Sequence, residues 1–462
     1  MVVEKMDWHA IPAGQWLDAG ASHEVFAGIS RFLHEQGTFE FPSLPNGLFP
    51  AASGMGEEFE VTGYRNIWVR DNVQVAFAHF QLGKIDPAVK CMKALLGFFQ
   101  KHRHRFEQVV DGVSEWQDPM KRPHIRFNGE SLEDLPEKWA HAQNDALGYF
   151  LWFYAVLVDA GAMPVWAIDW ELLALMMRYF EVIRYWEDED SGHWEESRKV
   201  SASSMGIVCE AIRKWIDLID RTIPEGIMRL NQAQYAISIE EVRSLYRKGN
   251  DELARILPAE CIQEDATKYR RHDAALVFLC YPINGVSRDL SECILDEVAE
   301  HLMGDHGVRR YRGDSYWCAD YKDLFSPDQR SVDFSDNLES RDRLLKPGTE
   351  AQWCIFDPAM SCAYGVHVAS DLRRGQGWNE RAWGKQLKHL KRSLSQLTHR
   401  DHSKGPYRCP ESRYLHKGEW TPNDITPLLW TQANLMQALW WAENNAKLFA
   451  GLGREPVSMT NS

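Results

Sequence analysis

Apolar residues recur along most of the chain at the three- or four-residue spacing of a helix with one buried face. This spacing predicts twelve helices, which span residues 22–36, 71–84, 86–104, 142–161, 164–186, 200–219, 223–256, 268–281, 287–304, 350–373, 376–398 and 427–449. One short stretch, residues 39–49, fits a two-stranded ribbon instead, and no series of strands alternates with the helices. The fold class is therefore predicted to be all-α.

Twelve consecutive helices without a low-complexity linker fit six helix pairs arranged as an (α/α)6 barrel. In this six-hairpin toroid, the loops at one end of the inner ring line a central funnel. An α-solenoid is the alternative, but no motif recurs at the period of about 34–47 residues that such repeats have. We therefore expect one domain over residues 1–462, with residues 1–20 and 451–462 as peripheral extensions.

Five loops between the predicted helices are too long to be simple connections in a compact domain. They are rich in Trp, Arg, Asp, Glu and Tyr, and they span residues 38–70, 105–141, 187–199, 305–349 and 399–426. Long loops that combine polar and aromatic residues usually carry function. The functional residues are therefore expected in these five loops.

The first of these loops leads into the sequence YRNIWVRD, residues 64–71, where a helix is expected to begin. Asp71 alone fits a helix cap, because its carboxylate can accept hydrogen bonds from free N–H groups of the first turn. The functional alternative is that Arg70 and Asp71 clamp neighbouring sugar hydroxyls as donor and acceptor. Tyr64 and Trp68 would then supply aromatic faces beside a developing positive charge.

The second loop ends in the sequence WAHAQND, residues 139–145, ahead of a long apolar helix. Asn144 or Asp145 can cap that helix, with Trp139 packed against its first turn. The functional alternative is that Trp139 stacks on a sugar ring while Gln143 and Asp145 act as its polar partners.

The third loop contains the sequence DEDSGHWEE, residues 188–196. Its acidic run, residues 188–190, predicts a solvated loop. Trp194 and Glu195 differ, because an indole beside a carboxyl supplies apolar surroundings that disfavour ionisation. A carboxyl that stays protonated near neutral pH can act as a general acid.

The last two loops contain the sequences RRYRGDSYW, residues 309–317, and CPESRY, residues 409–414. Interleaved basic and aromatic residues also occur in proteins that bind nucleic acid, but the first patch is single and short. Glu411 lies more than two hundred residues after Glu195. Hydrolysis of a glycosidic bond needs one carboxyl that protonates the leaving oxygen and one that activates water. The two glutamates are therefore the candidate catalytic pair.

The composition narrows the class of function. A formal net charge of -14 argues against a nucleic-acid partner. Nineteen tryptophans suit sugar binding, because indole rings stack on the C–H faces of pyranoses. The sequence has no nucleophile-elbow, P-loop or dinucleotide-binding motif, and its nine cysteines lack zinc-ligand spacing. No cofactor and no metal are therefore predicted.

The expected location is the cytoplasm. The N-terminus lacks the pattern of a signal peptide, and no apolar run is long enough to span a bilayer, so no membrane contact is predicted. The odd, dispersed set of cysteines is typical of free thiols in a reducing compartment.

Taken together and in order, these motifs resemble those of the family-15 glycoside hydrolases, the glucoamylase-like group. They resemble as closely the glucoamylase-like domain of the phosphorylase kinase α and β subunits. The resemblance covers residues 60–445, and its most specific parts are the Tyr-x-x-x-Trp-x-Arg-Asp spacing at 64–71 and the Trp-x-x-x-Gln-x-Asp spacing at 139–145. The segments SASS, residues 201–204, and PLLWTQA, residues 427–433, are closer to the kinase-subunit branch.

The resemblance implies an (α/α)6 barrel and inverting hydrolysis at the non-reducing ends of α-glucans. It also implies that Glu195 is the general acid and Glu411 the general base, about 6.5–9.5 Å apart as in inverting enzymes. The residues expected to bind the substrate are Tyr64, Trp68, Arg70, Asp71, Trp139, Gln143, Asp145, Trp194, Arg310, Asp314 and Tyr414.

Two departures from the family pattern leave alternatives open. Ala142 stands where glucoamylases usually carry proline, and Ser191-Gly192-His193 departs from the family before the Trp-Glu pair. The substrate and the choice between Glu195 and Glu196 as the acid therefore stay open.

We expect an intracellular, exo-acting α-glucoside hydrolase whose partner is an α-linked glucose oligosaccharide or glucan. The second hypothesis is a non-catalytic, phosphorylase-kinase-like regulatory or glucan-sensing protein, for which a partner such as glycogen phosphorylase would be sought. A purely structural α-toroid is the third.

Overall fold

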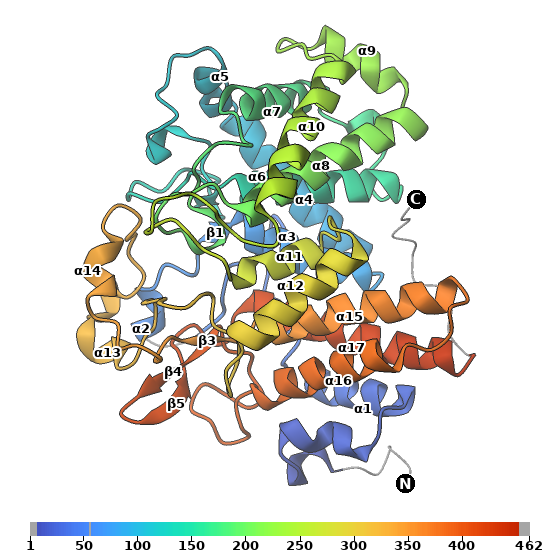
Figure 1. Cartoon of the computed structure of the whole chain (residues 1–462), viewed down its shortest axis with the longest axis vertical. Coiled ribbons are helices and arrows are strands. Elements are labelled where there is room, and N and C mark those ends of the chain that lie inside the picture. The colour runs from blue at the N-terminus through green and yellow to red at the C-terminus, as the bar shows by residue number, and fades with distance from the viewer. Residues whose placement is uncertain (1–6, 55–56, 452–462) are drawn as a thin grey trace.

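Six helices form a closed inner ring in which each helix packs against the next (Figure 1). The computed structural model describes residues 7–54 and 57–451. In ring order, the inner helices are α3 (Val69–Gln81), α6 (Asn144–Asp159), α8 (Ala202–Arg221), α11 (Val277–Cys280), α15 (Phe356–Arg373) and α17 (Leu429–Phe449). The ring closes because α17 packs against α3.

Six further helices alternate with these along the chain and form the outer layer: α1 (His23–Glu35), α4 (Ile85–Lys101), α7 (Trp170–Val182), α10 (Ile239–Ile256), α12 (Arg288–His301) and α16 (Glu380–Ser395). The sequence explains the two layers. Every residue from Asn144 to Ala155 of α6 is buried, as expected for a helix covered on all sides. In α16 the buried positions Ala382, Gln386, Leu390 and Leu394 recur every four residues, which gives one buried face.

The predicted all-α (α/α)6 barrel is therefore confirmed. The five other α-helices in the described part of the chain are α2 (Glu57–Glu60), α5 (His104–Val110), α9 (Glu225–Gln232), α13 (Tyr321–Leu324) and α14 (Leu338–Asp342). Two predicted helices differ. Residues 223–256 divide into α9 and α10, and residues 268–281 form only the short α11 after a 3-10 turn that Asp273 caps.

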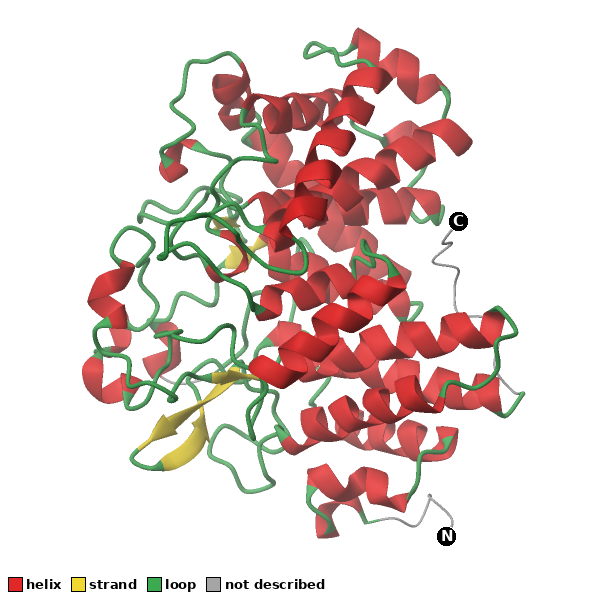
Figure 2. Ribbon diagram, in the orientation of Figure 1, coloured by secondary structure: helices red, strands yellow, loops and turns green. Residues whose placement is uncertain are grey.

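The strands are short and belong to the loops. Strand β1 (Ile67–Trp68) pairs antiparallel with β2 (Arg126–Phe127), and β3 (Gln352–Trp353) pairs with β4 (Ser412–His416), which forms a hairpin with β5 (Glu419–Pro422). The ribbon predicted at residues 39–49 is wrong, because these residues form turns and irregular backbone. Figure 2 shows the strands and most long loops gathered on one side of the helical ring.

The sequence predicts one domain with peripheral extensions at both chain ends, and this division stays a prediction. Within the N-terminal extension, a 3-10 helix (Ala13–Ala19) packs against α16, and Trp16 is fully buried. Residues 1–6 and 452–462 lie outside the described part of the chain. Among the described residues, no helix combines the length and the apolar character needed to cross a bilayer. The nine cysteines form no disulfide.

Candidate active site

A cavity opens where the segments that precede the inner helices meet. The space between its walls is about 790 Å³, part of it continuous with solvent. Its walls come from the starts of α3 and α17 and from the loops before α6, α8 and α15. Nine of the thirteen predicted site residues line it: Tyr64, Trp68, Arg70, Asp71, Trp139, Trp194, Glu195, Arg310 and Glu411. Loops far apart in the sequence therefore converge on one funnel.

Glu195 lies in the wall directly after a 3-10 turn (Gly192–Trp194). Its backbone is left-handed (φ 58°), a conformation that is uncommon outside glycine and that gathers at functional sites. Its Oε1 accepts hydrogen bonds from the indole N–H of Trp68 at 2.9 Å and the guanidinium of Arg70 at 3.2 Å. Burial raises the pKa of Glu195, and the attraction of Arg70 opposes this only in part.

The next residue, Glu196, lies behind the cavity wall in an ion-pair cluster. Its carboxylate accepts hydrogen bonds from Arg310 at 2.6 Å, from Arg341 and from the hydroxyl of Tyr311. Burial acts to raise the pKa of Glu196, but the charges of Arg310 and Arg341 outweigh it and lower the pKa to about 2. Glu196 therefore carries no proton to donate near neutral pH.

Glu411 immediately precedes β4 and is almost completely buried at the cavity wall. The hydroxyl of Tyr64 donates a hydrogen bond of 2.8 Å to Oε1, and the side-chain amide of Asn423 donates one of 2.6 Å to Oε2. Burial raises the pKa of Glu411 to about 7, although both hydrogen bonds favour the charged form. No sequence motif pointed to Asn423, which is brought to Glu411 by the hairpin of β4 and β5.

Arg70 and Asp71 lie in the first turn of α3, and both line the cavity. Asp71 is not the helix cap, because Trp68 occupies the cap position. Burial raises the pKa of Asp71 to about 7 against the attraction of Arg70. This pair is therefore placed as the predicted donor–acceptor clamp, while its contact with a sugar stays a prediction.

Gln143 and Asp145 lie behind Arg70 and are not among the residues that line the cavity, and their predicted contact with the substrate stays a prediction. The guanidinium of Arg70 donates hydrogen bonds to Asp145 Oδ2 at 2.8 Å and to Gln143 Oε1 at 3.0 Å. Asp145 is fully buried. Both side chains thus fix the direction of the Arg70 guanidinium.

Asp314 and Tyr414 are also not among the residues that line the cavity, and their predicted contact with the substrate likewise stays a prediction. Asp314 is fully buried and accepts two hydrogen bonds from Arg310, at 2.7 and 2.6 Å, so it positions the arginine that lines the cavity. Tyr414 is buried against Trp317, with ring centroids 4.9 Å apart.

The acidic run at residues 188–190 is not the solvated loop that the sequence predicted. Asp188 is buried and forms an ion pair with Arg122 through two hydrogen bonds.

Five tryptophans contribute to the cavity wall: Trp68, Trp139, Trp194, Trp353 and Trp430. Among the described side chains, the buried indole nitrogens of Trp139, Trp353 and Trp430 have no hydrogen-bond partner. The indole nitrogens of Trp152 and Trp317, which are not part of the cavity wall, also lack a partner, so this feature alone does not mark a ligand position. Trp194 instead donates to Asp273 at 2.8 Å, so the indole bonded to Glu195 is Trp68 and not its sequence neighbour.

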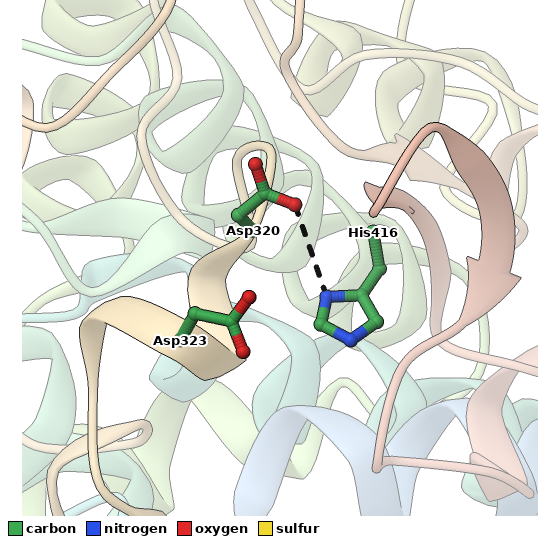
Figure 3. A group of neighbouring side chains, drawn as sticks. All are labelled: Asp320, Asp323 and His416. Carbon is green, nitrogen blue, oxygen red and sulfur yellow. Dashed lines mark ion pairs between the residues drawn. The ribbon is translucent and has the colours of Figure 1, made fainter.

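One group of side chains elsewhere has the composition of a metal site. Asp320, Asp323 and His416 place one ligand atom each within 4.8 Å of one another, and Asp320 and His416 point toward each other (Figure 3). However, Asp320 already pairs with Lys346 at 3.1 Å and accepts a hydrogen bond from the backbone N–H of Lys417. We assign no catalytic role to this group, and the expected absence of a metal and a cofactor stays a prediction.

Comparison with known proteins gives an independent result. Residues 41–445 match the family model of the glycosyl hydrolases family 15. A curated relative, the uncharacterized lipoprotein YgeQ of Escherichia coli (strain K12), is 26% identical over 175 residues. That match covers 32% of this chain and spans 63% of the length of the relative.

Solved structures with a similar fold include the wild type of a glycosidase, 16% identical, with a TM-score of 0.57 over 97% of this chain and 100% of the other. The glucoamylase from Saccharomycopsis fibuligera is 12% identical, with a TM-score of 0.55 over 92% and 96%. A bacterial glucoamylase complexed with acarbose is 12% identical, with a TM-score of 0.52 over 92% and 56%. At these identities the likeness concerns the fold alone.

Proposed function

The chain belongs to family 15 of the glycosyl hydrolases and is a glycoside hydrolase, and from this premise we propose which reaction it performs. It releases glucose from the non-reducing end of an α-glucan or an α-linked oligosaccharide, with inversion at the anomeric carbon. The observation that carries this proposal is that Glu195 and Glu411 both line one cavity walled by indoles.

Glu195 is the general acid in this proposal. Its raised pKa keeps a proton available, and the hydrogen bonds from Trp68 and Arg70 hold Oε1, which leaves Oε2 to face the leaving oxygen. Glu196 is unsuited to this role because two arginines hold it ionised. The choice left open by the sequence therefore falls on Glu195.

Glu411 is the general base. Hydrogen bonds from Tyr64 and Asn423 fix its carboxylate and favour the charged form that accepts a proton. In the reaction, Glu195 donates its proton to the glycosidic oxygen as the C1–O bond breaks. A water molecule attacks C1 from the opposite face and loses its proton to Glu411, which yields β-glucose.

Arg70 and Asp71 hold the terminal glucose at the bottom of the cavity. A guanidinium that is fixed by two neighbours donates to hydroxyls without losing much side-chain entropy, and Asp71 accepts from them. The indoles of Trp139 and Trp430 provide apolar faces in the cavity wall, and their N–H groups have no partner in the described structure.

The proposal also includes an intracellular substrate. The nine free cysteines support it, because free thiols are typical of a reducing compartment.

A panel of α-linked glucose disaccharides tests the proposal. The wild type is expected to release glucose from at least one of them, and Glu195→Gln and Glu411→Gln are expected to lose turnover by orders of magnitude while still folding. Binding of these sugars without any release of glucose would instead support the regulatory, phosphorylase-kinase-like alternative.

A further inference from the structure

Residues 331–334, a segment of the long loop 305–349 that contains none of the predicted site residues, form part of the cavity wall. They lie between α13 and α14, and Ser331, Val332, Asp333 and Phe334 all line the cavity. In the described structure, Ser331 Oγ and Asp333 Oδ2 are buried and have no hydrogen-bond partner. Buried oxygens without a partner are costly, and both of these belong to residues that line the cavity, where a hydroxyl of a bound ligand would supply the missing partner.

The position of this segment assigns it to the mouth of the cavity. Arg70 and Asp71, at the start of an inner helix, are 5% and 8% exposed, whereas Val332 is 45% exposed although it also lines the cavity. Helices α13 and α14, on either side of the segment, lie on the loop side of the molecule away from the ring (Figure 1). The segment is therefore the outer wall, opposite the ring of inner helices.

Contacts on both sides hold Asp333 in place. Its Oδ1 accepts a hydrogen bond of 2.8 Å from the backbone N–H of Ser335, which fixes the side chain against its own turn. Its Oδ2 lies 3.9 Å from Lys138 Nζ, beyond hydrogen-bond distance, and Lys138 also forms an ion pair with Asp336. Lys138 thus ties the segment to the loop before α6, while Asp333 Oδ2 keeps its hydrogen-bonding capacity for another group.

We propose that residues 331–334 bind the sugar unit that leaves when glucose is released, and that Asp333 determines specificity by accepting a hydrogen bond from a hydroxyl of that unit. This inference rests on the proposed function for the direction in which the substrate enters. An exo-acting enzyme takes the non-reducing glucose to the bottom of its cavity, so the leaving unit lies at the mouth. The substrate class is then a glucoside whose leaving group is itself a sugar.

A pair of matched variants tests the inference on two substrates. Asp333→Asn keeps the Oδ1 bond to Ser335 but removes the charged acceptor, and Asp336→Asn makes the same change on an exposed residue of the same segment that also pairs with Lys138. The substrates are an α-linked glucose disaccharide, from the panel above, and α-glucosyl fluoride, which has no leaving sugar.

Asp333→Asn is expected to lower kcat/KM for the disaccharide about tenfold, which corresponds to about 1.4 kcal/mol for the lost charged acceptor. Its kcat/KM for α-glucosyl fluoride is expected to stay within about twofold of the wild type, and Asp336→Asn is expected to change neither. Equal losses on both substrates, or no loss on the disaccharide, would overturn the inference.

Calorimetric titration separates this inference from the proposed function. Asp333→Asn is expected to weaken the binding of the disaccharide about tenfold and to leave the binding of glucose unchanged. If the wild type binds both sugars but hydrolyses neither substrate, the proposed function fails while the binding difference still decides the role of Asp333. Unchanged disaccharide binding in Asp333→Asn would contradict that role.

Discussion

Arg310 donates a hydrogen bond of 2.6 Å to Glu196, the residue that directly follows Glu195. This contact gives two adjacent glutamates different surroundings. Glu196 is held ionised between Arg310 and Arg341, whereas burial raises the pKa of Glu195 at the cavity wall. Neighbouring titratable groups whose surroundings separate their pKa values commonly have separate roles.

The first prediction separates these roles. Glu195→Gln is expected to lower kcat by at least about a thousandfold and to leave Tm unchanged within a few degrees. Glu196→Gln is expected to lower Tm, because it leaves two buried arginines without their shared counter-ion, a change that costs about 3–5 kcal/mol in comparable sites.

Steady-state kinetics and thermal unfolding of the two variants check this prediction. Glu339→Gln, on an exposed position of α14, serves as the control for the substitution itself. The assignment of the acid would be wrong if Glu196→Gln kept its stability and lost turnover while Glu195→Gln remained active.

The second prediction distinguishes the acid from the base. Fluoride leaves without prior protonation, so Glu195→Gln is expected to keep most of the wild-type rate on α-glucosyl fluoride. Glu411→Gln is expected to lose activity on this substrate as well, because water still has to be activated. Release of fluoride from both variants is measured with an ion-selective electrode, and the opposite ranking would exchange the two roles.

The third prediction concerns Asn423, which touches only the base of the proposed pair. Asn423→Ala removes a hydrogen bond that favours the ionised form of Glu411, so the pKa of Glu411 is expected to rise above its present value of about 7. The acidic limb of the pH profile of kcat/KM should shift to higher pH by the same amount. An equal loss of activity at every pH, with the limb unmoved, would assign Asn423 a purely structural role.

The fourth prediction follows from the same carboxyl. Burial raises the pKa of Glu411 from its ordinary value near 4.5 to about 7. A raised pKa of an acid means that the folded state binds the proton more tightly. The contribution of Glu411 to the free energy of unfolding is therefore fully present below pH 4.5 and is lost as the pH rises through 7.

Glu411→Gln removes this loss. The variant is expected to match the wild type at pH 4.5 and to unfold at a higher temperature at pH 8. At roughly 1.4 kcal/mol per pKa unit, its free energy of unfolding at pH 8 is expected to exceed that of the wild type by up to about 3 kcal/mol. Thermal unfolding at both pH values, with the exposed Glu419→Gln as a control, measures the difference. A lower Tm of Glu411→Gln at pH 8 would contradict it.

The sequence was sufficient for the helical layers because their patterns are local. The predicted helices at 427–449 and 22–36 correspond to α17 and α1, since in both segments the apolar residues themselves carry the helical signal. The division between α9 and α10 also had a local signal that the prediction missed. Ser238 and Glu241 form a capping box, which marks the beginning of a helix.

The hairpin of β4 and β5 shows a different limit. Its two-residue turn, Lys417-Gly418, has positive φ at both positions, as a type I′ turn requires. Lysine at the first of these positions is a weak turn signal compared with asparagine or aspartate. The hairpin was therefore not expected, and neither was the contact of Asn423 with Glu411 that depends on it.

The roles of individual site residues depended on contacts between distant loops. The motifs predicted Arg70, Arg310, Asp145 and Asp314 alike as substrate-binding residues. Only the structure separates the two arginines in the cavity wall from the aspartates that hold them from behind. Asp333 lies in the loop 305–349, where functional residues were expected, but no motif pointed to this residue, because its unpartnered oxygen depends on the walls around it.

The stereochemistry of the released glucose tests the central claim most directly. The purified wild type is incubated with an α-linked glucose disaccharide that it cleaves, and the anomeric proton signals are followed by NMR before mutarotation is complete. A reaction in which Glu195 protonates the leaving oxygen while Glu411 activates water on the opposite face yields β-glucose first. Initial release of α-glucose, or no release from any α-linked disaccharide, would contradict this account.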